Sequence, residues 1–537
     1  MADLILINGS VWTVNSAQPR AEAVALRGHT IAAVGKTQEI KKLAGTKTKV
    51  IDLKGALVLP GFIDSHTHFL EGGFSLSSIQ LRDVFSRDGF VKRIEEKARG
   101  LEKGEWILHG NWDHEQFTPP ELPRKEWIDA VSPENPVCVS RYDEHIALAN
   151  SLALKVAGIT KDTKSPEGGE IQKDPKTGEP TGILRDAAID LVMRHAPKPS
   201  PKARLEAAES ALRHAREVGV TSVHDMADES SFEACLDTYL ELLKVGQLTA
   251  RITLYIPISR MDLIEKLRLQ VPPENGWVKV GGLKGFVDGG LGASTAYFFE
   301  PYKDDPRNFG LLAPQMFPEG IMEKRALEAD SSGLQLAIHA IGDRANFIIL
   351  NIFEKTAAQN GRRDRRWRVE HAQHLRPEDI GRFGGLGVIA SVQPFHAIDD
   401  GRWAETKIGQ ERCRTTYAFK SLLDSGATLA LGSDWPVAPL NPLIGIYAAV
   451  TRQTTDGKNP DGWFPEQKIP LEDAIRGFTR NGAYAEFSEE IKGSIEAGKW
   501  GDLVVLDRNI LEIPPEEIQE AKVTLTIVGG KIVYDRL

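Results

Sequence analysis

Alternating hydrophobic and polar positions mark both ends of the chain. Near the start, LILING, AVALRGHTIAAVG and KVIDLKGALVLP alternate as short strands do, with turn residues between them. Near the end, GDLVVLD and VTLTIVGGKIVYD repeat the pattern, and Gly529-Gly530 marks a hairpin turn. Small sheets with exposed edges are poor domains alone. We therefore predict one small β-sandwich, built from residues 1–58 together with residues 489–537.

The middle of the chain, residues 59–488, alternates strand-like and helix-like segments. In one helix, Ser200 can act as the cap, Pro201 occupies the first turn and Gly219 ends the helix. The strand candidates number eight: ALVLPGFIDSHTH, VTSVHDM, ARITLYIPI, WVKVGGLKGFVDGG, LQLAIHAIG, WRVEHAQHL, LGVIASVQPFH and ATLALGSDWPV. This order predicts an α/β fold, a TIM-like (β/α)8 barrel inserted in the terminal β-sandwich, whose active site forms at the carboxyl ends of the strands.

A long stretch separates the first two strand candidates. It covers about residues 72–180, is rich in Trp, Pro and charged residues, and exceeds an ordinary connecting loop. We expect an insertion with its own structure, placed near the barrel mouth by its point of attachment.

Composition limits the classes of partner. The 537 residues carry 66 basic and 75 acidic side chains, a formal net charge of -9, with no long run of Lys or Arg. Nucleic acid and membrane surfaces are therefore poor partners, and we expect a small-molecule substrate; self-association into a homo-oligomer stays open. The three cysteines fit no zinc or redox spacing, and we expect no secretion signal and no membrane span. A cytoplasmic location follows.

Metal-ligating residue types stand late in the strand candidates. In an extended strand, His66 and His68 point to the same face. The full series in strand order is His66, His68, Lys284, His339, His371 and Asp434. A lone histidine is more often a packed residue, but this ordered series at one end of a barrel predicts a site for one or two divalent metal ions, with zinc expected. Asp434 is the candidate to take a proton from the attacking water and return it to the leaving group.

Several phrases of the chain resemble a known family. They are PGFIDSHTH, KGFVDGGLGASTA, LAIHAIGDRAN, RVEHAQHL, SVQPFH and LGSDWPV. Together they are similar to the amidohydrolase superfamily, specifically amidohydrolase family 3, whose members include YtcJ-like and N-substituted formamide deformylase-like proteins. The resemblance spans nearly the whole chain. It implies a metal-dependent hydrolase with a barrel inside a split β-sandwich, which acts on carbon–nitrogen bonds other than ordinary peptide bonds.

The same resemblance gives Lys284 a special role. In several branches of the superfamily a lysine on the fourth strand, carbamylated by carbon dioxide, bridges two metals, and an unmodified ammonium cannot ligate. The alternative is an ion pair of Lys284 with Asp288 or Asp434.

A second comparison concerns the fifth strand, where deaminase branches usually place a Glu three residues after the histidine. Gly342 stands there, which disfavours nucleobase deamination.

The resemblance also suggests substrate contacts. Trp112 and His145 match segments of family 3, although Glu144 stands where the family commonly has Gly, so the turn that presents His145 departs from the family pattern. Gln393 and His396, at the end of the seventh strand, are the other candidates.

The predicted activity is metal-dependent hydrolysis of a small amide, formamide or related compound. The alternatives are a deaminase or cyclic amide or imidate hydrolase on the same scaffold, and a non-catalytic relative.

Overall fold

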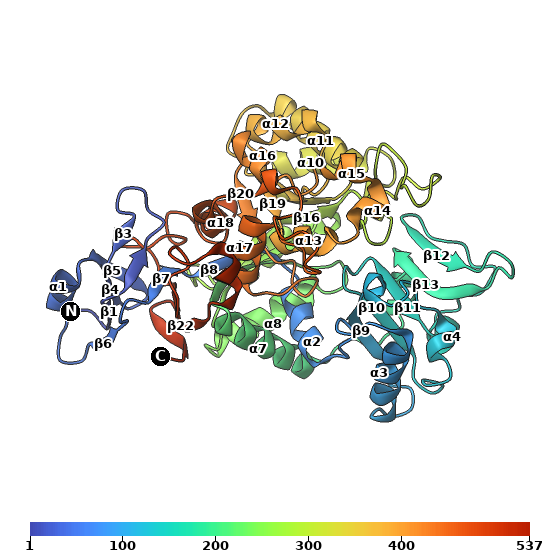
Figure 1. Ribbon diagram of the computed structural model, residues 1–537, viewed down its shortest axis with the longest axis horizontal. Coiled ribbons are helices and arrows are strands. Elements are labelled where there is room, and N and C mark those ends of the chain that lie inside the picture. Colours follow the sequence, from blue (N-terminus) through green and yellow to red (C-terminus); the bar gives the residue numbers. More distant parts are fainter.

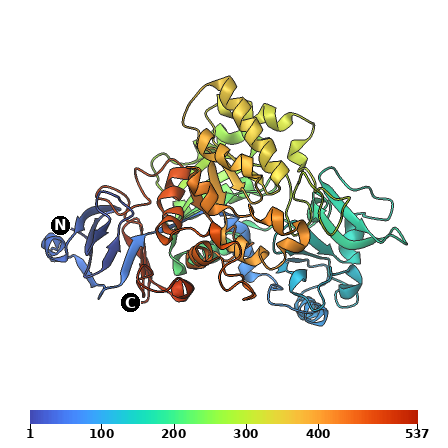
Figure 2. The ribbon, with the colours of Figure 1, turned by 45° about the horizontal axis from the view of Figure 1, so that its top comes forward.

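The computed structural model describes residues 1–537 and divides the chain into three parts that lie in a row (Figure 1). A β-domain that holds both termini stands at one end, the barrel lies in the middle, and the insertion forms the other end. The turned view shows the same order (Figure 2). No helix combines the length and apolar character that crossing a membrane requires.

The β-domain consists of two sheets to which both chain ends contribute. The smaller sheet has the order β5 (Thr30–Gly35), β4 (Ala23–Arg27), β1 (Leu4–Ile7) and β6 (Lys49–Asp52). The larger has the order β23 (Lys531–Asp535), β22 (Val523–Val528), β21 (Leu503–Leu506), β7 (Leu57–Pro60), β2 (Ser10–Trp12) and β3 (Arg20–Ala21). The antiparallel pair of β7 and β21 joins the two ends of the chain, as the strand patterns predicted.

The eight predicted barrel strands form one parallel sheet. In chain order they are β8 (Phe62–Thr67), β14 (Val220–Met226), β15 (Arg251–Pro257), β16 (Val278–Phe286), β17 (Leu336–Ala340), β18 (Arg368–His371), β19 (Ile389–Val392) and β20 (Leu429–Leu431). A parallel bridge between Thr67 and Trp435 links the two outermost segments. The predicted fold class is therefore confirmed.

Helices surround this sheet (Figure 1). They include α2 (Phe69–Ser77), α7 (Pro201–Glu217), α8 (Phe232–Lys244), α9 (Ile264–Gln270), α10 (Ile321–Ser331), α11 (Asp343–Asn360), α12 (Pro377–Leu386), α13 (Pro394–Asp400), α16 (Phe419–Asp424), α17 (Pro442–Thr451), α18 (Leu471–Gly477) and α19 (Arg480–Ala485). The start of α7 is the predicted one, because the Ser200 hydroxyl accepts a hydrogen bond of 3.2 Å from the Ala203 amide. Gly219, with a φ of 77°, turns the chain into β14.

The insertion has its own sheet and its own core. The strand order is β12 (Gly169–Lys173), β13 (Pro180–Asp186), β11 (Ile146–Ala149), β10 (Val137–Arg141) and β9 (Ile107–Trp112). The accompanying helices are α3 (Arg87–Arg99), α4 (Lys125–Ile128), α5 (Ser151–Val156) and α6 (Asp190–Met193). The sheet runs on to Asp186, whereas the sequence placed the end of the insertion at about residue 180. Helix α2, which leads from the barrel into the insertion, packs against α7 of the barrel.

Candidate metal centre

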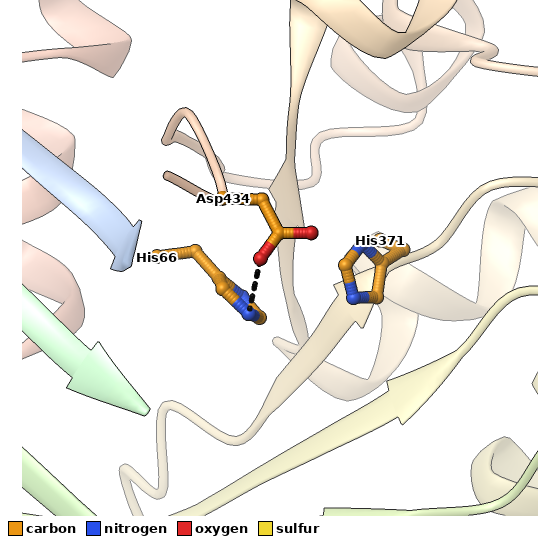
Figure 3. Close-up of side chains that lie close together, drawn as sticks. All are labelled: His66, His371 and Asp434. Atoms are coloured by element: carbon orange, nitrogen blue, oxygen red, sulfur yellow. Dashed lines mark ion pairs between the residues drawn. The ribbon is translucent and has the colours of Figure 1, made fainter. Parts of the chain in front are cut away.

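Three of the predicted metal ligands converge where the barrel strands end. His66 lies near the end of β8, His371 is the last residue of β18, and Asp434 follows β20. Their side chains point toward one another (Figure 3), and one ligand atom from each lies within 4.8 Å of the others. All three residues are buried. The carboxyl ends of parallel strands meet at one rim of the barrel, so residues far apart in sequence form one group.

The Asp434 carboxylate lacks a hydrogen-bond partner for one of its oxygens. Asp434 Oδ1 is buried, 3.4 Å from His66 Nε2 and 3.5 Å from His68 Nε2, and accepts no hydrogen bond. A buried acceptor without a partner is costly. Burial alone would raise the pKa of Asp434, but the neighbouring imidazoles hold it well below its usual value. The site therefore contains an ionised carboxylate oxygen with room for a cation.

Hydrogen bonds on the far side of the two imidazoles fix their orientation. His66 Nδ1 lies 2.6 Å from Glu370 Oε2, and His371 Nδ1 lies 2.8 Å from Gln393 Oε1. Both partners are acceptors, so each ring donates through Nδ1 and keeps the lone pair of Nε2 for the site. Burial and Lys284 lower the pKa of His66 to about 4. Neutral imidazoles and one carboxylate suit a divalent transition metal, and the residues fit such an ion.

Lys284 lies directly beside this group. Its Nζ is 3.4 Å from His66 Nε2, the side chain is buried, and burial lowers its pKa to about 8. Neither of the ion pairs considered from sequence is formed. Asp288 instead accepts hydrogen bonds from three backbone amides, those of Tyr297, Ile341 and Gly342. Lys284 is thus a buried amine without a carboxylate partner.

His68 and His339, the other predicted ligands, flank the three gathered residues. His68 faces Asp434 and immediately precedes helix α2 as its N-cap residue. The His339 ring lies 4.5 Å from that of His371, centroid to centroid, but its Nε2 points to the Gly289 carbonyl oxygen at 3.3 Å. Both are adjacent to the group, and His339 would have to turn to offer Nε2 to an ion there.

An open cavity of about 290 Å³ leads to the group. The barrel provides the predicted ligands, and the insertion provides Glu144, His145, Asp186 and Asp190. The turn before His145 is kept although the chain has Glu144 there, because Glu144 adopts a φ of 61°, the region that favours Gly. His145 Nδ1 lies 2.6 Å from Asp186 Oδ1, which leaves Nε2 of the ring free.

The four expected substrate contacts occupy different positions around the site. Trp112 does not line the cavity: its side chain is fully buried in the core of the insertion, and its indole N–H donates to the Val139 carbonyl at 2.8 Å. Gln393 lies behind the metal centre, where its amide oxygen accepts from His371 Nδ1 at 2.8 Å. His145 and His396 both line the cavity.

Sequence reasoning missed two residues of the site, Glu370 and Asp186. Glu370 stands next to His371 in β18, and Arg368 precedes it by two positions on the same strand face. A charged pair at alternating positions of a strand that must lie inside a barrel was the available signal. Asp186, at the end of β13, carried no comparable signal, because nothing in the sequence brings it near His145.

A steric constraint explains why position 342, after the fifth barrel strand β17, holds a glycine. A Cβ at Gly342 would lie 2.1 Å from the Tyr297 carbonyl oxygen, so a side chain cannot be placed there without moving the backbone. The following Asp343 accepts a hydrogen bond of 2.9 Å from the Phe299 amide and lines no part of the cavity. The fold thus supplies no carboxylate at the position where deaminase branches usually have Glu.

The chain is similar to known proteins over its whole length. The sequence pattern of the amidohydrolase family matches residues 49–534. Protein LONG AFTER FAR-RED 3 of Arabidopsis thaliana is 42% identical, over 99% of this chain and 92% of that protein. A putative amidohydrolase, YtcJ, of Bacillus subtilis is 32% identical over 98% of both chains. N-substituted formamide deformylase of Arthrobacter pascens is 29% identical over all of this chain and 99% of that one.

A solved structure shares the fold. The metal-dependent hydrolase from Pyrococcus horikoshii is 27% identical, with a TM-score of 0.76 over 95% of this chain and 99% of that one.

Proposed function

This chain belongs to the amidohydrolase family, and from that membership we propose that it is a metal-dependent hydrolase of a carbon–nitrogen bond other than a peptide bond. The substrate is a small amide, formamide or related compound. The observation that carries the proposal is the buried, unpartnered oxygen of Asp434, which faces imidazoles whose Nε2 lone pairs point inward. The deformylase relative supports the bond type, and the Pyrococcus relative supports the metal.

His66, His371 and Asp434 would hold the ion, with His68, His339 and Lys284 beside them. When bound, a divalent metal such as zinc lowers the pKa of water toward neutrality and polarises a carbonyl group. Asp434 is the group that moves the proton. Because its pKa is held low, it is ionised at neutral pH, can accept a proton from the attacking water and can pass it to the departing nitrogen.

His145 and His396 are the proposed substrate contacts in the cavity. Burial lowers the pKa of His145, but Asp186 outweighs burial and the pKa is raised to about 9. The ring is therefore a cation at neutral pH whose free Nε2–H can donate to a substrate oxygen. Asp186 fixes the direction of that donor.

Lys284 is the proposed site of carbamylation. A buried amine whose pKa is lowered to about 8 is partly neutral near pH 7.5, and only the neutral amine reacts with carbon dioxide. The product would be a carboxylate-like ligand beside His66. Carbamylation would also convert a buried amine that has no carboxylate partner into a group that can bind the metal.

The direct test of the proposal is Asp434→Asn, which keeps the shape of the side chain and removes the base. We expect kcat/KM to fall at least about 100-fold on any substrate found in a panel of amides, formamides and cyclic imides. Metal content should be measured on the same samples. Asp424→Asn, the same change at an exposed position on α16, is the control and should keep full activity.

Two outcomes of this experiment count against the proposal. Retained turnover by Asp434→Asn at normal metal loading would remove the proton role of Asp434. Release of ammonia or ring opening of an imide, without cleavage of simple amides, would favour the deaminase or cyclic amide alternatives.

A further inference from the structure

Beneath the candidate metal centre, a buried ion pair occupies the inside of the barrel. Arg368 and Glu370 alternate on β18, and both side chains are fully buried. Arg368 Nε lies 2.7 Å from Glu370 Oε1, and Arg368 Nη2 donates to Glu370 Oε2 at 3.1 Å. Isolated buried charges are very costly, so a pair of this kind persists only where both members are well supported.

The pair is supported from several strands. Arg368 donates to the Ser391 hydroxyl on β19 at 2.9 Å and to the carbonyl of Ser65 on β8. Arg368 Nη1 also lies 2.8 Å from His224 Nδ1 on β14. These contacts fix the guanidinium, and the guanidinium in turn fixes the Glu370 carboxylate. Glu370 is therefore a rigid, ionised acceptor inside the barrel.

Glu370 Oε2, which accepts from Arg368, also contacts His66. An ionised carboxylate can only accept, so His66 must donate from Nδ1 across the 2.6 Å contact with Glu370 Oε2. The opposite tautomer would place two acceptors against each other at a contact between two buried side chains. The contact thus selects the tautomer of His66 and sets the plane of its ring.

We propose that Glu370, held by Arg368, is the positioning residue that keeps the Nε2 lone pair of His66 directed into the metal site and thereby sets the affinity for the metal. Glu370 does not touch substrate and acts through His66. The inference rests on the proposed function, because it assumes that His66 binds a metal. Carboxylates placed behind a ligating histidine raise its basicity and orient it, with effects of about 10- to 100-fold on metal affinity.

The test measures Zn²⁺ affinity of the metal-free protein by competition with a chromophoric chelator. Glu370→Gln keeps the volume but removes the charge, and its amide group must set either a donor or a weaker acceptor against His66. We expect the Kd for Zn²⁺ to rise about 10- to 100-fold. An unchanged Kd in this variant would overturn the inference.

The matched control is Glu486→Gln. Glu486 lies deeper in the same buried cluster, where its Oε1 is 2.5 Å from Lys492 Nζ and its Oε2 is 3.5 Å from His224 Nε2, but it does not touch His66. This variant loses a buried carboxylate as Glu370→Gln does, and we expect a lower Tm with an unchanged Kd. Equal weakening of Zn²⁺ binding in both variants would assign the effect to a loosened barrel core and would overturn the inference.

A second measurement does not depend on whether Glu370→Gln folds. Long-range ¹H–¹⁵N spectra of the metal-free wild-type protein, with His66 assigned by comparison with His66→Gln, report which ring nitrogen is protonated. We expect a protonated Nδ1 and a bare Nε2. The opposite tautomer contradicts the proposed role of Glu370, whereas failure of the wild-type protein to bind Zn²⁺ or Co²⁺ would instead contradict the proposed function.

Discussion

At the scale of residues, two of the three gathered ligands have a strained backbone. His371 has a φ of 72° and Asp434 a φ of 63°, a region in which a residue other than Gly costs about 1–3 kcal/mol. The Asp434 amide donates to the His66 carbonyl at 2.7 Å, and the His68 amide donates to the Trp435 carbonyl at 2.8 Å. These two bonds tie the segment after β20 to β8. The strained conformation of Asp434 is thus held by the strand that carries His66.

Trp112 allows a test that separates packing from catalysis. Trp112→Phe removes the indole bond to Val139 and part of the ring from a fully buried site. We expect the insertion to lose about 1–3 kcal/mol of stability. Because the side chain lies outside the cavity, kcat/KM on an accepted substrate should stay unchanged. Differential scanning calorimetry and steady-state kinetics on the same preparation check both statements.

His145→Asn is the contrasting variant, since it changes a ring that lines the cavity. We expect it to lower kcat/KM with little change in Tm. The reverse pattern, a Trp112→Phe protein with normal Tm and impaired kinetics, would restore Trp112 as a substrate contact.

At the scale of elements, the order of the strands could be predicted from the sequence. The contacts between side chains that face the inside of the barrel could not. His66, His371 and Asp434 each follow a recognisable strand pattern, and parallel strands deliver their ends to one rim. The partners of these residues depend on the stagger between strands. Glu370 meets His66 across 304 positions of sequence, and only the closed barrel decides which interior side chains face each other.

Helix α7 offers a prediction at this scale. Ser200→Ala removes the hydroxyl that accepts from the Ala203 amide, which costs about 1 kcal/mol at a helix start. Amide hydrogen exchange in the first turn, at residues 202–204, should therefore become roughly fivefold faster. Ser210→Ala, inside the same helix, is the control and should not speed exchange in that turn. Equal rates in Ser200→Ala and the wild-type protein would refute the capping role.

At the scale of the whole molecule, the cavity lies where the barrel and the insertion meet. The barrel brings the candidate ligands, and the insertion brings Glu144 and the His145–Asp186 pair. The joining of both chain ends was predictable, because each end alone would leave open strand edges. The fold of the insertion was not, since strand β11 pairs with both β10 and β13, and Asp186 reaches His145 only through that sheet.

The most direct test of the central claim is a crystal structure of the protein with anomalous diffraction measured at the absorption edge of the metal found in the sample. We expect an anomalous peak within coordination distance of His66 Nε2, His371 Nε2 and an Asp434 carboxylate oxygen, and electron density beyond Nζ of Lys284 that fits a carbamate. A plain amine at Lys284 would contradict only the carbamylation. After metal supplementation, the absence of a peak among His66, His371 and Asp434 would contradict the metal-dependent function itself.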